Sequence, residues 1–327
     1  TQGHWYNDKA PTGPIKRILT DSRHAESGDA FLALKGERFD AHDFVAQVAA
    51  NGCEIAIVSH PVDADICQLV VADTRLALGH LGAYRREQNS QLKVIALTGS
   101  SGKTTTKEML GSILSRLAPT LITRGNLNND LGVPMMLLEL RAEHQYAVME
   151  LGASHKGEID YTSNLVQPQV AGILNIGTAH MGEFGGRDGI CHAKSEIYAH
   201  ITSTGTSIVP ADDDFTDSIR GAVQTENVMS FGQGGDVYAT EVKLQAQSSS
   251  FVLNTPQGSR SVQLPFAGEH NVQNATAATA FALSIGVSLE DIVIGLEHAT
   301  GAKGRLNFIP HKEHLFIDDT YNANPTS

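Results

Sequence analysis

The chain has few cysteines, few basic residues and no long apolar run. Its 327 residues include three cysteines, Cys53, Cys67 and Cys191, whose spacing fits neither a metal site nor a redox motif. We therefore expect reduced thiols in a cytoplasmic protein. No apolar stretch approaches the ~20 residues needed to cross a bilayer, and the first residues lack the apolar segment of a signal peptide. From these absences we expect neither a membrane-spanning nor a secreted protein.

Positive charge is also scarce. Lysine and arginine together number 24 against 36 aspartates and glutamates, which gives a net charge of −12 at pH 7. General binding to nucleic acid or to a membrane surface requires a positive surface, so we expect neither partner. A small anionic substrate is still compatible with this balance, because a few local cations can hold a phosphate within an acidic protein.

The length and the hydrophobic pattern predict an α/β protein with about two domains. We expect a small N-terminal α/β domain at 1–88, and a central P-loop domain at 89–312 with a mostly parallel sheet and an antiparallel extension. Residues 313–327 open a further region, and we expect the chain to be truncated there. Periodicity and turn signals predict strands at 30–34, 54–58, 68–71, 93–97, 146–150, 170–174 and 315–318, short alternating strands at 236–264, and helices at 103–117, at 271–285 and after the capping residue Asp73.

The strongest local motif lies between the strand at 93–97 and the helix that follows it. It is a shortened P-loop, GxxGK[ST], in which Leu97 stands where the full pattern has another glycine. The glycines let backbone N–H groups turn toward phosphate oxygens, and the helix N-terminus adds partial positive charge. Lys103 would reach the terminal phosphates and the Thr104 hydroxyl would bind Mg²⁺. The alternative is a Gly/Ser turn that contains a lysine by chance. The nucleotide-binding residues expected here are Gly99, Ser100, Ser101, Gly102, Lys103, Thr104 and Thr105.

Three residues downstream are candidate partners of this loop. Glu150 ends one predicted strand and His180 follows another, where ligands of a phosphoryl-transfer site gather in a parallel sheet. Without the loop, each would be interpreted as a solvated or structural side chain. Lys194 lies on a predicted helix and composition alone makes it a surface lysine.

A series of short motifs then points to one enzyme family. They occupy residues 21–23, 28–36, 99–105, 126–134, 149–152, 178–182, 194–197, 270–274 and 319–325. In this order and spacing they resemble the Mur ligases, ATP-dependent peptide ligases of bacterial cell-wall synthesis, over essentially the whole chain. Residues 321–325 resemble the branch that joins D-alanyl-D-alanine to UDP-N-acetylmuramoyl-tripeptide, which are the partners that the resemblance implies.

The resemblance implies an acyl-phosphate reaction and two Mg²⁺ ions. In the family, a peptide carboxylate attacks the γ-phosphate of ATP, and an amine then displaces phosphate from the acyl carbon. Thr104 and Glu150 would hold one ion, and His180 and Lys194 the other, with Lys103 completing the catalytic set. An ammonium has no lone pair for a metal, so Lys194 would act as its CO₂ adduct, a carbamylated lysine. That adduct forms from the neutral amine, so the site should depress the lysine pKa.

Further contacts are implied residue by residue. On the nucleotide side these are Asn271, Asn274, Arg305, Asp319 and Asn322, although Asn271 and Asn274 could instead cap a helix. On the substrate side they are Asn128 and Asn129, facing the muramoyl peptide, and Ser22, Arg23, Lys35 and Gly36, gripping the UDP portion. Arg23 could equally form a structural ion pair. Ala41 departs from the glycine that this branch commonly carries before His42, on the side of the site that the resemblance assigns to UDP.

Several hypotheses stay open. The family's Rossmann-like C-terminal domain is expected to be missing after Ser327, so one alternative is an ATP-binding fragment that is inactive without it. Folylpolyglutamate synthetase and the Mur ligase that adds the third residue share the fold and the loop. An unrelated P-loop kinase or GTPase would leave the other motifs unexplained. We expect a monomer.

Overall fold

The computed structural model describes residues 2–36, 39–178, 181–301, 307–312 and 314–320. The chain divides into two compact units, residues 1–88 with 134–139, and residues 89–133 with 140–327. Both units are built on sheets of parallel strands, so the expected α/β class is confirmed. Within the described residues, no helix has the length and apolar character that a bilayer crossing requires.

The first unit contains a five-stranded sheet in the order β1-β5-β4-β3-β2. β2 to β5 run parallel and β1 pairs antiparallel with β5. The predicted strands and the Asp73 cap are confirmed, because the Asp73 carboxylate accepts bonds from the N–H groups of Arg75 and Leu76. β1 and β2 are too short to give a periodic signal. The elements are β1 His4–Trp5, η1 Tyr6–Asp8, β2 Ile18–Leu19, η2 Ser22–His24, β3 Ala30–Leu32, η3 Ala41–Phe44, α1 Val45–Ala50, β4 Ile55–Val58, β5 Cys67–Val70, α2 Thr74–Glu87 and most of α4 Gly132–Leu138.

The second unit is centred on a six-stranded parallel sheet in the order β11-β10-β9-β6-β8-β7. The central strands β6, β8, β9 and β10 are short apolar runs buried over most of their length, the pattern of a sheet covered by helices on each side. From β6 the chain passes to the edge strand β7, returns to β8 and then crosses to β9, β10 and β11, so the strand order reverses between β6 and β9, which is where ligands bind in such sheets. The strands are β6 Lys93–Thr98, β7 Thr120–Ile122, β8 Tyr146–Glu150, β9 Val170–Ile173, β10 Thr206–Pro210 and β11 Asn227–Phe231.

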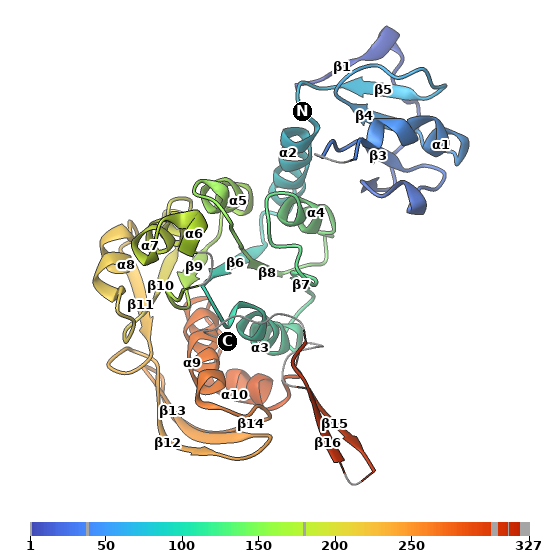
Figure 1. Cartoon of the computed structure of the whole chain (residues 1–327). Helices are drawn as coiled ribbons and strands as arrows, with labels where there is room; N and C mark the ends of the chain where they lie inside the picture. Colours follow the sequence, from blue (N-terminus) through green and yellow to red (C-terminus); the bar gives the residue numbers. More distant parts are fainter. Residues whose placement is uncertain (1, 37–38, 179–180, 302–306, 313, 321–327) are drawn as a thin grey trace. The chain divides into compact units, whose positions relative to one another are not determined.

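Two groups of helices cover this sheet (Figure 1). α3, α9 and α10 pack together on one face, and α5, α7 and η4 pack together on the other. Most of α9 is buried, and its many alanines let neighbouring elements approach closely. The helices are α3 Lys103–Ser115, α5 Glu158–Val166, α6 Met181–Phe184, α7 Arg187–Ser195, η4 Glu196–Tyr198, α8 Thr216–Ala222, α9 Glu269–Ser284 and α10 Leu289–Glu297.

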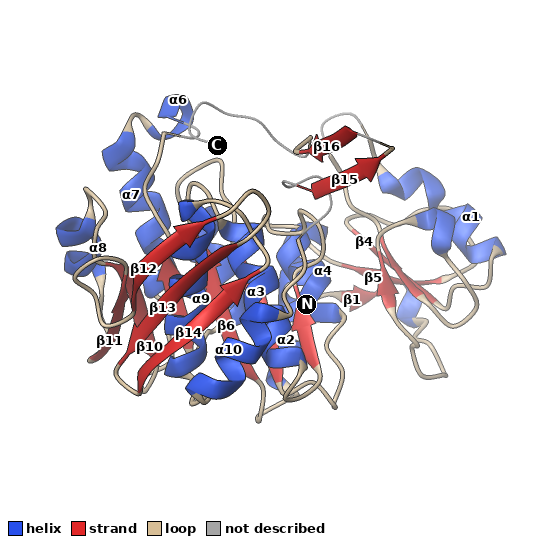
Figure 2. Ribbon diagram, turned by 90° about the horizontal axis from the view of Figure 1, so that it is seen from below, coloured by secondary structure: helices blue, strands red, loops and turns tan. Residues whose placement is uncertain are grey.

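An antiparallel sheet extends this unit, as the alternating pattern predicts. β12 Tyr238–Leu244, β13 Ser249–Thr255 and β14 Gly258–Leu264 lie side by side in that order, next to α9 and α10 (Figure 2). α9 contacts both this sheet and the parallel one, so the apolar side chains of both sheets share one core. A hairpin of β15 Asn307–His311 and β16 His314–Asp318 follows.

Candidate active site

The phosphate-binding motif forms the turn between β6 and α3. Gly102 is the N-cap of α3 and adopts a left-handed backbone with φ +77°, which favours glycine. A Cβ atom on Gly102 would collide with Oδ1 of Asn274, from the first turns of α9. Two separate constraints therefore require glycine here, and they bring the loop against a helix far away in the sequence.

The loop is braced from the neighbouring strand by Asn175, which follows β9. The Asn175 Oδ1 atom accepts a bond of 3.0 Å from the Ser101 N–H, and its Nδ2 donates to the Ser101 carbonyl oxygen over 3.1 Å. The Ser100 N–H donates to the Asn175 carbonyl oxygen over 3.1 Å. Within the loop, Lys103 Nζ donates to the Gly99 carbonyl oxygen over 2.7 Å. Asn175 was not among the predicted site residues. It follows β9, a neighbour of β6, and this position could have identified it from the sequence.

Glu150 ends β8, beside β6, and joins the loop to a second segment. Its carboxylate is almost fully buried, with 2% of the residue exposed. The Thr104 hydroxyl donates to Glu150 Oε2 over 3.3 Å, and Asn128 Nδ2 donates to Oε1 over 2.8 Å. The Thr123 hydroxyl accepts the Glu150 N–H over 2.9 Å. Three residues singled out from sequence, Thr104, Asn128 and Glu150, therefore meet at one point. Asn129 instead accepts a bond from the Gly132 N–H over 2.8 Å.

Lys194 lies near the end of α7 and is buried, with 6% of the residue exposed. Burial first, and the positive charge of Lys103 second, lower the pKa of Lys194 from 10.5 to about 7. A substantial fraction of its amine is therefore neutral near pH 7. This is opposite to the surface lysine that composition alone suggests.

Asn271 and Asn274 are buried on the first turns of α9. Gly268 is the N-cap and carries no side-chain cap, so neither asparagine caps the helix in that way. Asn271 Nδ2 donates to the Ala267 carbonyl oxygen over 2.8 Å, and Asn274 Nδ2 donates to Asn271 Oδ1 over 3.2 Å. Asn274 also lines a pocket beyond the ends of β9, β10 and β11, together with apolar, amide and carboxylate side chains. This mixture suits a flat ring with polar edges.

Three of the predicted residues, His180, Arg305 and Asn322, lie outside the described residues. Asp319 is exposed beyond β16, and Thr105 lies in the first turn of α3.

In the first unit, the Arg23 guanidinium pairs with Asp21, Nη2 to Oδ2, over 2.6 Å and lowers the pKa of that carboxyl. The ion-pair interpretation of Arg23 thus has direct support. Lys35 Nζ lies 3.5 Å from Asp40 Oδ2, and Gly36 donates its N–H to the Phe39 carbonyl oxygen. Ser22 is buried in η2.

The donor set was tested for a metal ion. Within the described part of the chain, no three His, Cys, Asp or Glu side chains gather as a metal site. Mg²⁺, however, commonly takes one or two carboxylates and completes its shell with phosphate oxygens and water. The paired oxygens of Thr104 and Glu150, next to a phosphate-type loop, fit that requirement.

Comparisons with known proteins agree with this geometry. The family model described as the Mur ligase middle domain matches residues 97–282, and that of the Mur ligase family, catalytic domain, matches residues 14–90. UDP-N-acetylmuramoyl-tripeptide–D-alanyl-D-alanine ligase of Escherichia coli (strain K12) is 45% identical over 314 residues, which cover 95% of this chain and 69% of that protein.

Two solved structures are similar over nearly all of the chain. A crystal structure of MurF from Acinetobacter baumannii has 79% identity and a TM-score of 0.98, covering 100% of this chain and 72% of that one. MurF ligase from Thermotoga maritima, in complex with ADP, has 30% identity and a TM-score of 0.86, covering 95% of this chain and 72% of that one.

Proposed function

Because the chain belongs to the Mur ligase family, we propose that it joins D-alanyl-D-alanine to UDP-N-acetylmuramoyl-tripeptide with consumption of ATP, as its relatives' names describe. The product is a precursor of peptidoglycan. The observation that carries the proposal is the meeting of Thr104 with Glu150 beside the phosphate-type loop. A buried lysine of lowered pKa, influenced by Lys103, supports it.

The chemistry proceeds in two steps. A carboxylate oxygen of the tripeptide attacks the γ-phosphorus, the bond to ADP breaks, and an acyl phosphate forms. The amine of D-alanyl-D-alanine then adds to the acyl carbon, loses a proton, and expels inorganic phosphate. The main barrier is the approach of a carboxylate to a polyanion, and preorganised positive groups lower it. The loop N–H groups and Lys103 supply such groups for the β- and γ-phosphates.

Two Mg²⁺ ions fit the remaining chemistry. Thr104 and Glu150 would hold the first, and His180 with Lys194 the second. When bound, the ions supply positive charge to the transferring phosphoryl group. Lys194 would serve as its carbamate, since the neutral amine adds CO₂, releases a proton and becomes a negatively charged group with oxygen ligands. The burial of Lys194 supports this role, because it favours the neutral amine.

The other proposed contacts fall on the nucleotide side and on the substrate side of the site. We assign the nucleotide side to Asn271 and Asn274, together with Arg305, Asp319 and Asn322. Asn128 and Asn129 would face the muramoyl peptide. Residues 1–88 would bind the UDP portion through Ser22, Arg23, Lys35 and Gly36. We propose that the protein acts as a monomer in the cytoplasm, where ATP and UDP-linked precursors are available.

A phosphate-release assay tests the proposal. This chain, and the longest natural form of the protein, would be incubated with ATP, UDP-N-acetylmuramoyl-tripeptide and D-alanyl-D-alanine, omitting each in turn. Sustained release that requires all three supports the ligase. Release with a folate or a single amino acid, and none with the dipeptide, would favour a related ligase instead. ATP binding without turnover in either form would leave only a nucleotide-binding module.

A further inference from the structure

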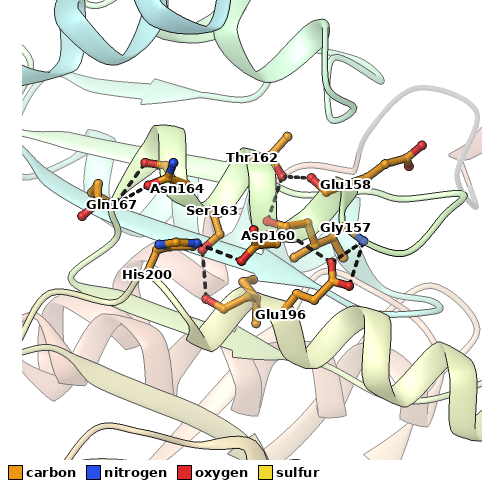
Figure 3. Close-up of polar contacts among 11 residues, drawn as sticks. Gly157, Glu158, Asp160, Thr162, Ser163, Asn164, Gln167, Glu196 and His200 are labelled. Atoms are coloured by element: carbon orange, nitrogen blue, oxygen red, sulfur yellow. Dashed lines mark hydrogen bonds and ion pairs between the residues drawn. The ribbon is translucent and has the colours of Figure 1, made fainter. Parts of the chain in front are cut away.

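The segment just after Lys194 is fastened to the start of α5 by one carboxylate (Figure 3). Glu196 Oε1 accepts the Gly157 N–H over 2.8 Å, and Oε2 accepts the same N–H over 3.0 Å. Oε2 also accepts the Asp160 N–H over 3.1 Å. The N-cap residue of α5 is Gly157, which offers no side-chain cap of its own. Glu196 therefore supplies from another segment the acceptor that a helix usually finds locally.

Two further contacts follow the same seam between α5 and residues 196–200. The Ser163 hydroxyl donates to the Ile197 carbonyl oxygen over 3.1 Å, and His200 Nε2 lies 2.9 Å from Asp160 Oδ1. Figure 3 shows these groups pointing toward one another across the seam. Glu196 differs from them because it accepts backbone N–H groups at the N-terminus of α5, where the helix dipole strengthens binding of a negative charge.

The start of α5 is itself tied to Glu150. Residues 151–157 lead directly from β8 to α5, and bonds hold them along their length. The Leu151 N–H donates to the Leu97 carbonyl oxygen over 2.9 Å, and the Gly152 N–H donates to that of Asn128 over 2.8 Å. Glu158 then accepts the Ser154 N–H over 2.8 Å. Glu196 is thus the point at which this fixed segment is joined to the one that carries Lys194.

Residues 196–198 are also held by contacts that do not involve this carboxylate. Ile197 and Tyr198 are buried, with 0% and 1% of each residue exposed, and the Tyr198 hydroxyl donates to the Ile208 carbonyl oxygen over 2.8 Å. These apolar contacts keep the segment against the sheet. The Glu196 carboxylate sets the position of the end of α7 relative to residues 151–157, the segment that follows Glu150.

We propose that Glu196 is a positioning residue for the ligase reaction, which holds Lys194 in register with Glu150 by capping α5. The inference rests on the proposed function, in which both residues are ligands. A residue that orients a ligand from behind commonly changes activity by about 10- to 100-fold when it is replaced. This positioning role does not require Glu196 to contact the substrate or the nucleotide.

The test compares Glu196→Ala and Glu196→Gln with a control variant, Ser288→Ala, which removes the N-terminal cap of α10. Ser288 caps α10 by accepting the Asp291 N–H over 3.1 Å, and α10 carries no proposed site residue. Turnover, ATP affinity, melting temperature and the ¹³C NMR signal of the Lys194 carbamate after addition of ¹³C-bicarbonate would be measured on the longest natural form. Lys194→Ala identifies that signal.

We expect Glu196→Ala to lower kcat about 10- to 100-fold with KM for ATP within about twofold, and to weaken or shift the carbamate signal. Glu196→Gln keeps one acceptor oxygen and should fall between the wild type and the alanine variant, which also provides a result if the alanine variant does not fold. Ser288→Ala should lower the melting temperature to a similar extent with unchanged kcat.

Wild-type kcat and an unchanged carbamate signal in both Glu196 variants would overturn the inference alone, provided that Lys194→Ala is inactive. An equal fall of kcat in Ser288→Ala would also overturn it, because stability would then explain the effect. Full activity of Lys194→Ala would overturn both the inference and the proposed role of Lys194.

Discussion

The Thr104 hydroxyl lies 3.3 Å from Glu150 Oε2, so the first turn of α3 and the carboxyl end of β8 meet at one point. Thr104 is held by its helix and Glu150 by its strand, and β8 pairs directly with β6, from which the loop departs. Because α3 and the paired strands fix the backbone of both residues and Asn128 holds the Glu150 carboxylate, binding of a cation there would need little rearrangement of the protein. The catalytic proposal is built on this pair.

Replacing Lys194 by alanine should lower turnover about 10²- to 10³-fold, the usual cost of losing a group that stabilises transition-state charge. The fold should survive, because the change removes a buried polar group and leaves the backbone of α7 intact. Steady-state phosphate release measures the effect. Lys243→Ala, an exposed position on β12, is the control and should keep wild-type turnover. Equal rates in the two variants would remove Lys194 from the mechanism.

Replacing Lys103 by alanine should weaken ATP binding about 10- to 100-fold, since a charge-assisted bond to phosphate is worth roughly 1.5–3 kcal/mol. Isothermal titration with ATP gives the dissociation constant. Lys243→Ala again provides the comparison. An unchanged affinity in Lys103→Ala would count against the loop as the phosphate site.

Replacing Gly102 by alanine should destabilise the protein and weaken nucleotide binding together. The left-handed backbone disfavours a side chain, and Asn274 occupies the space that a Cβ would need. We expect a loss of about 1–3 kcal/mol in the free energy of unfolding. Gly221→Ala is the opposite case, because it lies in α8 with open space around it, and it should gain up to about 1 kcal/mol. Urea denaturation measures both, and equal values would contradict the account.

The lowered pKa of Lys194 predicts a pH-dependent stability. In the folded chain the amine loses its proton near pH 7, whereas in the unfolded chain it does so near pH 10.5. Between these values the unfolded state binds more protons, so the free energy of unfolding rises with pH across this window. The rise should be at most about 5 kcal/mol and should be absent in Lys194→Met. Urea denaturation in CO₂-depleted buffer, from pH 7 to 10, gives the difference, and parallel curves would contradict the burial argument.

The parts of the site that lie close together in sequence were predictable. Strand, glycine-rich turn and helix occur in one continuous stretch, so the loop, Lys103 and Thr104 were located from the motif alone. Glu150 also followed from its place at a strand end, because parallel strands bring such ends together. The antiparallel extension was visible as alternation with period two.

Contacts between distant segments were not predictable. Asn175 braces the loop and Glu196 caps α5 through side chains whose partners lie far away in sequence. The place of Asn175 beyond β9 marks that residue, but no local pattern identifies the partner of either side chain. The burial of Lys194 was hidden for the same reason, since composition alone makes any lysine a surface residue. The family resemblance singled out Lys194, and the structure shows that it is buried with a lowered pKa.

The central claim is that a carboxylate of the tripeptide becomes an acyl phosphate, and an isotope measurement tests it most directly. The tripeptide substrate would carry ¹⁸O in both oxygens of its reacting carboxylate, and the released phosphate would be analysed by mass spectrometry. Because the acyl C–O bond breaks when the amine adds, each phosphate should carry one ¹⁸O atom. Phosphate free of ¹⁸O, released in step with amide formation, would contradict the account.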